Sequence, residues 1–223
     1  MKLRIVTLLL CAVAVASAQL YPNKLAMIQS ASFYMSDPRI QLELKLTPDQ
    51  VQGVNTILGE HAETQRGISE KLAKAKDTQY GQIQSEMDKL DLATSDKLIA
   101  ALNLTQKKRL KQIAYQENGA FALRNAAIAK EVGLAPAQRT KIETICQATS
   151  KSMDDVNAKM ADEIVKVPNS GTKAGEDKKN AIAKKYIPVL DGMEAKAKKD
   201  ILATLTPAQS KKWQSMLGKP FKV

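Results

Sequence analysis

Four glutamines have the most specific hydrogen-bonding chemistry in this chain, because each stands four residues after a leucine at an expected helix start. The shared template is Leu-x-x-x-Gln-x-x-x-apolar-x-x-apolar. A carboxamide both donates and accepts, so at the third helical position it can close a capping box with the residue before the helix. The motif residues are Leu46, Thr47, Pro48 and Gln50, then Leu102, Asn103 and Gln106, then Leu134, Pro136 and Gln138, then Leu205, Thr206, Pro207 and Gln209. The template predicts four helix starts and no catalytic group.

The four starts differ in expected strength. Thr47 and Thr206 are N-cap residues whose hydroxyl accepts from the amide of the glutamine three residues on. Asn103 is expected to give a weaker version of the same box, and Ala135 has no side chain that can cap. Three of the starts place proline at the first helical position, where its missing N–H costs nothing.

The N-terminus has the pattern of a secretory signal peptide over residues 1–18. An apolar run from Ile5 to Val15 follows two basic residues, and small residues precede a predicted cleavage site between Ala18 and Gln19. Cys11 follows leucine rather than the small residue of a lipoprotein signal, which disfavours lipid attachment. The pattern predicts release into the periplasm.

The mature chain keeps one cysteine, Cys146, so the fold must rest on packing rather than on an internal disulfide. Cys146 stands on an apolar helix stripe, which predicts a buried, inert thiol. The whole chain contains three Phe, one Trp and five Tyr. Large aromatic anchors are therefore scarce, and this composition favours thin helical layers packed by Ala, Leu, Ile and Met.

Positive charge is concentrated in the second half. The formal charge of +11 falls to +9 after removal of the leader, and residues 134–223 carry +7 of it. Such asymmetry favours an anionic partner or surface, and a solvated lysine-rich helix face explains it equally well. The candidate basic binding surface is Lys178, Lys179, Lys184, Lys185, Lys198 and Lys199.

Apolar residues recur at helical spacing along the chain, and no stretch alternates long enough for a strand. We therefore predict an all-α fold of duplicated antiparallel helical hairpins, packed as a thin, elongated bundle. A lead-in over 19–32 precedes a first repeat at 33–120 and a second at 121–223. The second repeat is longer by an inserted polar loop near 166–179. Pro188 is expected to kink or restart its helix.

The residue inventory argues against an enzyme. The chain has a single histidine, no glycine-rich phosphate loop and no cysteine pair for zinc or redox chemistry. His61 lies on an apolar stripe and is expected to be partly buried and hydrogen-bonded. Acidic pairs such as Asp154-Asp155 and Asp162-Glu163 fit a solvated helix face. We expect no catalytic residue, no cofactor and no metal site.

The leader, the helical pattern and the starts Leu46 to Gln50 and Leu205 to Gln209 resemble the Spy/CpxP family of periplasmic LTxxQ proteins, with Leu134 to Gln138 as a degenerate copy. The segment Trp213 to Phe221 looks like the tail of related uncharacterised exported bacterial proteins. In that family motif pairs pack together, and thin hairpins form a curved dimer. Known members are ATP-independent periplasmic chaperones or sensors of envelope stress. The metal-sensing members are rich in histidine, and this chain has only His61, so metal binding does not carry over.

The resemblance implies an exported, non-enzymatic binding protein that shields unfolded envelope proteins. Its halves are expected to pair within one chain, as a pseudo-dimeric monomer, or the chain forms a homodimer. An alternative is a structural or peripheral envelope protein whose basic half binds anionic lipid or cell-wall polymer. A third is a regulatory domain that binds a membrane sensor. Nucleic acid is not an expected partner, because the lysines lack interleaved aromatic or arginine residues.

Overall fold

The computed structural model describes residues 31–168 and 172–221, and every regular element within those ranges is a helix. The predicted all-α fold is confirmed. The predicted signal peptide, and the lead-in up to residue 30, lie outside the described residues. The chain divides into two compact units. The first contains the described residues up to Asn118 together with the segment from Ser215 onward, and the second is Gly119–Gln214.

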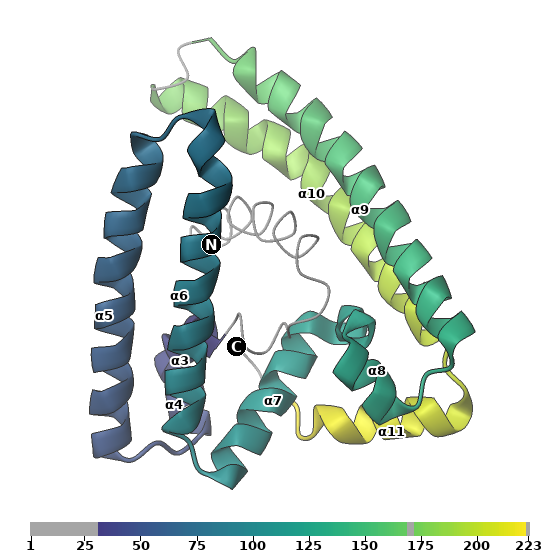
Figure 1. The fold of residues 1–223 in the computed structure, drawn as a ribbon. Coiled ribbons are helices and arrows are strands. Elements are labelled where there is room, and N and C mark those ends of the chain that lie inside the picture. The colour runs from purple at the N-terminus through teal and green to yellow at the C-terminus, as the bar shows by residue number, and fades with distance from the viewer. Residues whose placement is uncertain (1–30, 169–171, 222–223) are drawn as a thin grey trace. The chain divides into compact units, whose positions relative to one another are not determined.

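The first unit is built on a long helical hairpin. Its elements are α3 (Ala31–Met35), α4 (Pro38–Glu43), α5 (Pro48–Ala73), η1 (Asp77–Gln79), α6 (Tyr80–Ala100) and α7 (Leu104–Asn118). Figure 1 shows α5 and α6 side by side. His61 of α5 contacts Asp91 of α6, and Lys71, further along α5, contacts the earlier residue Glu86. The two helices are therefore antiparallel.

The core of the first unit lies at the open end of this hairpin, where α3, α4 and α7 pack against the start of α5 and the end of α6. It consists of Ala31, Tyr34, Met35, Ile40, Leu44, Val54, Leu98, Leu102, Leu110, Ile113 and Ala114. Toward the turn the hairpin has few buried apolar residues, among them Ile68 and Ile83. Most of each long helix thus packs against a single neighbour.

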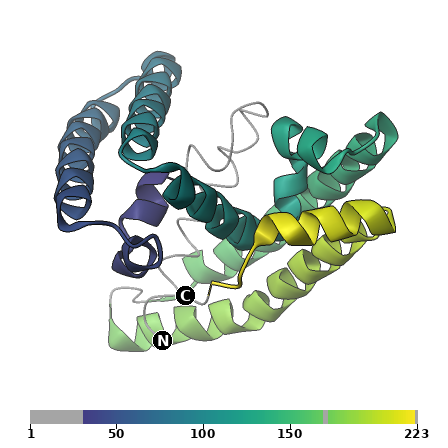
Figure 2. The ribbon, with the colours of Figure 1, turned by 90° about the horizontal axis from the view of Figure 1, so that it is seen from below.

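The second unit contains a second long hairpin, visible in Figures 1 and 2. Its elements are η2 (Gly119–Arg124), α8 (Ala126–Val132), α9 (Pro136–Val165), α10 (Lys173–Leu202) and α11 (Pro207–Leu217), of which the last residues belong to the first unit. Asn125 caps α8 by accepting from the amides of Ala127 and Ile128. Arg124 pairs with Glu143 of α9 at 2.8 Å, which ties η2 to the hairpin.

One expectation about an element boundary was wrong. The loop predicted near 166–179 is shorter, because Thr172 accepts from the amide of Gly175 and starts α10 at Lys173. Helix α7 ends at Asn118, where the chain changes to a 3₁₀ segment at Gly119, which has φ +53°.

Of the two outcomes expected at Pro188, a kink or a restart, the restart does not occur, because α10 runs on through the proline. The helix is held against α9 on both sides of the proline. Tyr186 donates its hydroxyl proton to Glu163 of α9 over 2.6 Å, and Leu190 is buried. Packing there offsets the backbone hydrogen bond that the proline removes.

Candidate functional site

The first pair of motifs meets through two glutamine side chains at the starts of α5 and α7. Gln50 Nε2 donates to Gln106 Oε1 over 2.9 Å, and Gln106 Nε2 donates to Gln50 Oε1 over 2.8 Å. Each nitrogen also donates to a backbone carbonyl, Gln50 to Ala101 at 2.8 Å and Gln106 to Lys45 at 3.4 Å. The amides therefore bind each other and the chain on either side.

The second pair of motifs repeats this arrangement at the starts of α9 and α11. Gln138 Nε2 donates to Gln209 Oε1 over 2.7 Å, and Gln209 Nε2 donates back to Gln138 Oε1 over 3.0 Å. Gln138 Nε2 also donates to the carbonyl of Thr204, and Gln209 Nε2 to that of Gly133, both over 2.7 Å. Both units thus contain the same reciprocal amide pair.

The four accepting carbonyls share one position. Each belongs to the residue immediately before the leucine of the partner motif, namely Lys45, Ala101, Gly133 and Thr204. Two of these residues have a left-handed backbone, Lys45 with φ +53° and Gly133 with φ +83°. An L residue is strained in that region and glycine is not. The pairing therefore depends on a backbone turn that Gly133 adopts without strain and that Lys45 adopts at a cost in conformational free energy.

The capping boxes predicted for α5 and α11 are confirmed. Thr47 Oγ1 accepts from the Gln50 amide at 3.2 Å, and Thr206 Oγ1 from the Gln209 amide at 3.3 Å. In each box the glutamine Oε1 accepts from the amide of the threonine, at 3.1 Å and 2.9 Å.

The other two starts differ from each other. Asn103, predicted to give a weaker version of the box, forms both of its hydrogen bonds with Gln106 at 2.9 Å. Ala135 makes no side-chain cap, as expected, and only its amide bonds to Gln138 Oε1, at 2.8 Å.

Sequence reasoning found the boxes and missed the cross-helix pairs. One signal was present, because a glutamine stands at the third helical position of α9 although Ala135 cannot complete a box there. A second role for the amide explains that glutamine. Gln106 is 5% exposed, and an amide buried to that degree needs partners for its polar atoms. The pairs therefore hold two helix starts together and carry out no chemistry on a ligand.

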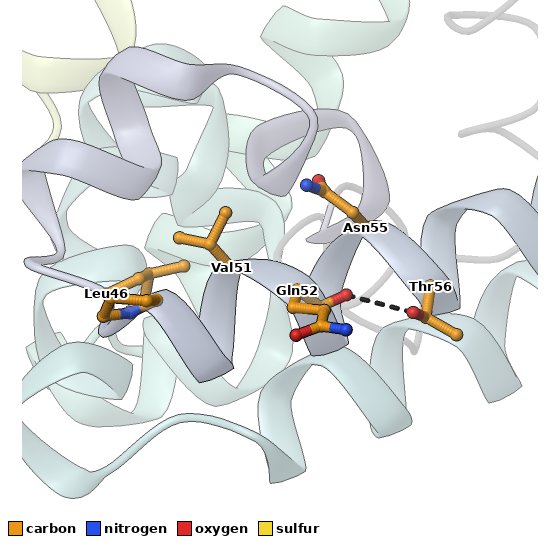
Figure 3. Close-up of a pocket in the computed structure, with 6 residues that line it drawn as sticks. Leu46, Val51, Gln52, Asn55 and Thr56 are labelled. Atoms are coloured by element: carbon orange, nitrogen blue, oxygen red, sulfur yellow. Dashed lines mark hydrogen bonds between the residues drawn. The ribbon is translucent and has the colours of Figure 1, made fainter.

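A shallow, open depression of about 690 Å³ lies beside the first motif (Figure 3). It is lined by Leu46, Pro48, Val51, Gln52, Asn55 and Thr56. The hydroxyl of Thr56 donates to the carbonyl of Gln52 over 3.1 Å, so it is already engaged within α5. The depression contains neither a charged side chain nor a convergent set of polar groups, and its lining suits a weak apolar contact.

All six candidate lysines lie on α10, but α10 does not present them as one positive face. Three are paired with acidic residues of the same unit: Lys179 with Glu176, Lys185 with Glu163 and Lys198 with Glu194. Lys178, Lys184 and Lys199 are exposed. The neighbours Lys184 and Lys185 point in directions about 100° apart, since a helix has 3.6 residues per turn. The lysines give a mixed, solvated surface with scattered positive charge.

The remaining candidate groups are structural. His61 is partly buried, as predicted, and its Nε2 lies 2.8 Å from Asp91 Oδ1. Cys146 is 4% exposed, and its burial raises the pKa of the thiol to about 11, which keeps it protonated and unreactive. The Arg124 guanidinium lowers the pKa of the Glu143 carboxyl that it binds.

Within residues 31–168 and 172–221, no three His, Cys, Asp or Glu side chains form a group that could hold a metal ion. Among the helices of those same ranges, none combines the length and apolar character needed to cross a bilayer. Comparison of the chain with family models, with curated proteins and with solved structures finds no match.

Proposed function

We propose that this protein is an exported, non-enzymatic binding protein that shields unfolded envelope proteins without ATP, as the Spy/CpxP proteins that its helix starts resemble do. Three features support the proposal: the two long hairpins with incompletely buried apolar stripes, the scattered lysines beside one of them, and the glutamine pairs that fix the helix starts.

The half-buried stripe of the second hairpin carries the most weight. The helix α9, described along its whole length, has no buried residue from Thr149 to Val165. Met153, Val156, Met160 and Ile164 stand at helical spacing in that stretch and are each only partly covered. Partly exposed methionine suits adaptable contact with many sequences, because its side chain is flexible and polarizable.

Two exposed apolar side chains lie on the same hairpin. Val165 at the end of α9 is 83% exposed, and Val189 of α10 is 45% exposed. Single exposed apolar residues are ordinary, but a stripe of partly covered apolar side chains along a two-helix hairpin favours reversible binding of apolar segments. The lysines of α10 add long-range attraction for acidic clients, which raises the encounter rate more than the affinity.

Ion pairing on α10 makes the alternative of an anionic-surface protein less attractive. Lys179, Lys185 and Lys198 are already neutralised by acidic neighbours. Adhesion to anionic lipid gains about 1 kcal/mol for each basic residue near the membrane, so it depends on a continuous cluster.

An aggregation assay distinguishes the two functions. A chemically denatured client is diluted with and without an equimolar amount of the purified chain, in the absence of ATP and at low and high salt. The chain is expected to suppress aggregation at low and at high salt, because apolar contact persists when charges are screened. The double variant Val165→Ser/Val189→Ser should suppress less. The control variant is Leu104→Ser, which removes a side chain from the first unit that is as exposed (84%) as that of Val165. This variant should suppress aggregation as well as the unmodified chain does. Absence of suppression with several clients, together with salt-sensitive binding to anionic vesicles, would reject the chaperone function.

A further inference from the structure

The last described residues of the chain form a non-helical segment that lies along α7. We call residues 218–221 the C-terminal strap. Gly218 ends α11 with φ +66°, and a Cβ at this position would overlap the Gln112 side chain. The left-handed turn therefore favours glycine at this position, whereas the flexible end of the Gln112 side chain can rotate away from a Cβ. The strap belongs to the first unit, as α7 does.

Gln116 of α7 binds the main chain of the strap. Its Nε2 donates to the carbonyls of Leu217 and Lys219 over 2.5 and 2.8 Å, and its Oε1 accepts from the Phe221 amide over 2.7 Å. One carboxamide thus binds the C=O of one residue and the N–H of the residue two further on.

Arg109 strengthens the same contact. Its Nη1 donates to the Lys219 carbonyl over 2.8 Å, while its Nε donates to Glu43 of α4 over 2.7 Å. The Arg109 side chain is 14% exposed, so the ion pair with Glu43 holds the guanidinium in place. Two side chains fixed on the first unit therefore converge on one peptide carbonyl of the strap.

The side chains of the strap contribute one apolar anchor. Phe221 packs against the core of the first unit. Lys219 and Pro220 are exposed. Because the hydrogen bonds go to main-chain atoms, they are available to any segment that adopts the same backbone conformation. Selectivity then rests on an aromatic residue two positions after the bound carbonyl.

We propose that α7 carries a binding site for a short non-helical peptide segment with an aromatic anchor, and that the C-terminal strap is its resident ligand, which a segment of an unfolded client displaces. The identification of the displacing segment with a client rests on the proposed function. The site itself rests on Gln116, Arg109 and the place of Phe221. A tethered ligand competes at an effective concentration near the millimolar range, so an added peptide binds well only after the strap is loosened.

The probe is a fluorescent peptide with the sequence of residues 215–223, and its binding is followed by anisotropy. The receptor is the full chain carrying Gly218→Val and Phe221→Ser, which disturb both ends of the strap. This variant should bind the probe at least tenfold more tightly than the unmodified chain does. Adding Gln116→Leu should reverse the gain, whereas Gln147→Leu, on an exposed face of α9, should leave it intact. A probe with serine in place of phenylalanine should bind at least tenfold more weakly.

Equal binding of the probe by the unmodified and strap-loosened chains would overturn the proposal, as would binding that Gln116→Leu leaves unchanged or no binding at all. Helical circular dichroism of each variant separates lost binding from lost folding. Suppression of client aggregation without probe binding would reject this site and leave the proposed function standing. Probe binding without any suppression would support the site and reject the function.

Discussion

Substitution of Gln138 and Gln209, singly and together, should show that their contributions to the free energy of unfolding are strongly coupled. Gln209→Ala removes hydrogen bonds to Thr206, to Gly133 and, in both directions, to Gln138. At about 1 kcal/mol net for each bond, less what water recovers around these partly exposed amides, the single substitution should cost about 2–3 kcal/mol. Gln138→Ala should cost a similar amount. Two bonds are shared, so the double variant should lose about 1–2 kcal/mol less than the sum of the singles.

The single tryptophan provides the assay. Trp213 is 3% exposed and lies one turn after Gln209 on α11, within the second unit. Its fluorescence during urea denaturation therefore reports on the unit in which the pair lies. The matched control is the double variant Gln50→Ala/Gln209→Ala, which takes one glutamine from each pair. These residues share no hydrogen bond, so their effects should add within about 0.5 kcal/mol. Coupling in the Gln138/Gln209 cycle no larger than in this control would refute the reciprocal pair.

Four further outcomes are expected. Lys45→Gly should raise the free energy of unfolding by about 0.5–1 kcal/mol in urea denaturation, because φ at this position is +53°; a loss would contradict the strained turn. Thr47→Ala should lower the unfolding free energy by about 1 kcal/mol, and Ala135→Thr should raise it by about 0.5 kcal/mol, both by denaturation midpoint. Ser95→Ala should be neutral or stabilising by up to about 1 kcal/mol, because the buried Ser95 hydroxyl has no hydrogen-bond partner within the described residues. The Cys146 thiol has a pKa raised from 9.0 to about 11 in the folded chain, so its contribution to stability is present below pH 9 and is lost as the pH rises toward 11. Cys146→Ala should remove that pH step from the stability profile.

Local chemistry made the helix starts predictable and left their pairing out of reach. The Thr47 box depends on residues three positions apart, so the sequence alone specifies it. The bond between Gln50 and Gln106 joins residues 56 positions apart, and the bond between Gln138 and Gln209 joins residues 71 apart. The residues around each glutamine do not indicate which other glutamine it will bind. The resemblance to LTxxQ proteins, which implies that motif pairs pack together, was the nearest indication of it.

Tertiary packing decided the features that the sequence left open or did not indicate. Pro188 has a low helix propensity, but packing against α9 keeps α10 helical on both sides of the proline. The C-terminal strap has no periodic pattern, and its place depends on Gln116, which is 105 positions away from Phe221. Gly218 and Pro220 are residue types that favour the end of a helix, but they give no sign of what the following residues bind.

The central claim, that this chain binds unfolded polypeptide, is tested most directly with one client in two forms. A fluorescently labelled protein is kept permanently unfolded by reduction and alkylation of its disulfides, and its native form serves as the comparison. Sedimentation velocity of each form with the purified chain, without nucleotide, measures the complex. The chain is expected to bind the unfolded form and to leave the native form free. Equal binding of both forms, or of neither, would contradict the account.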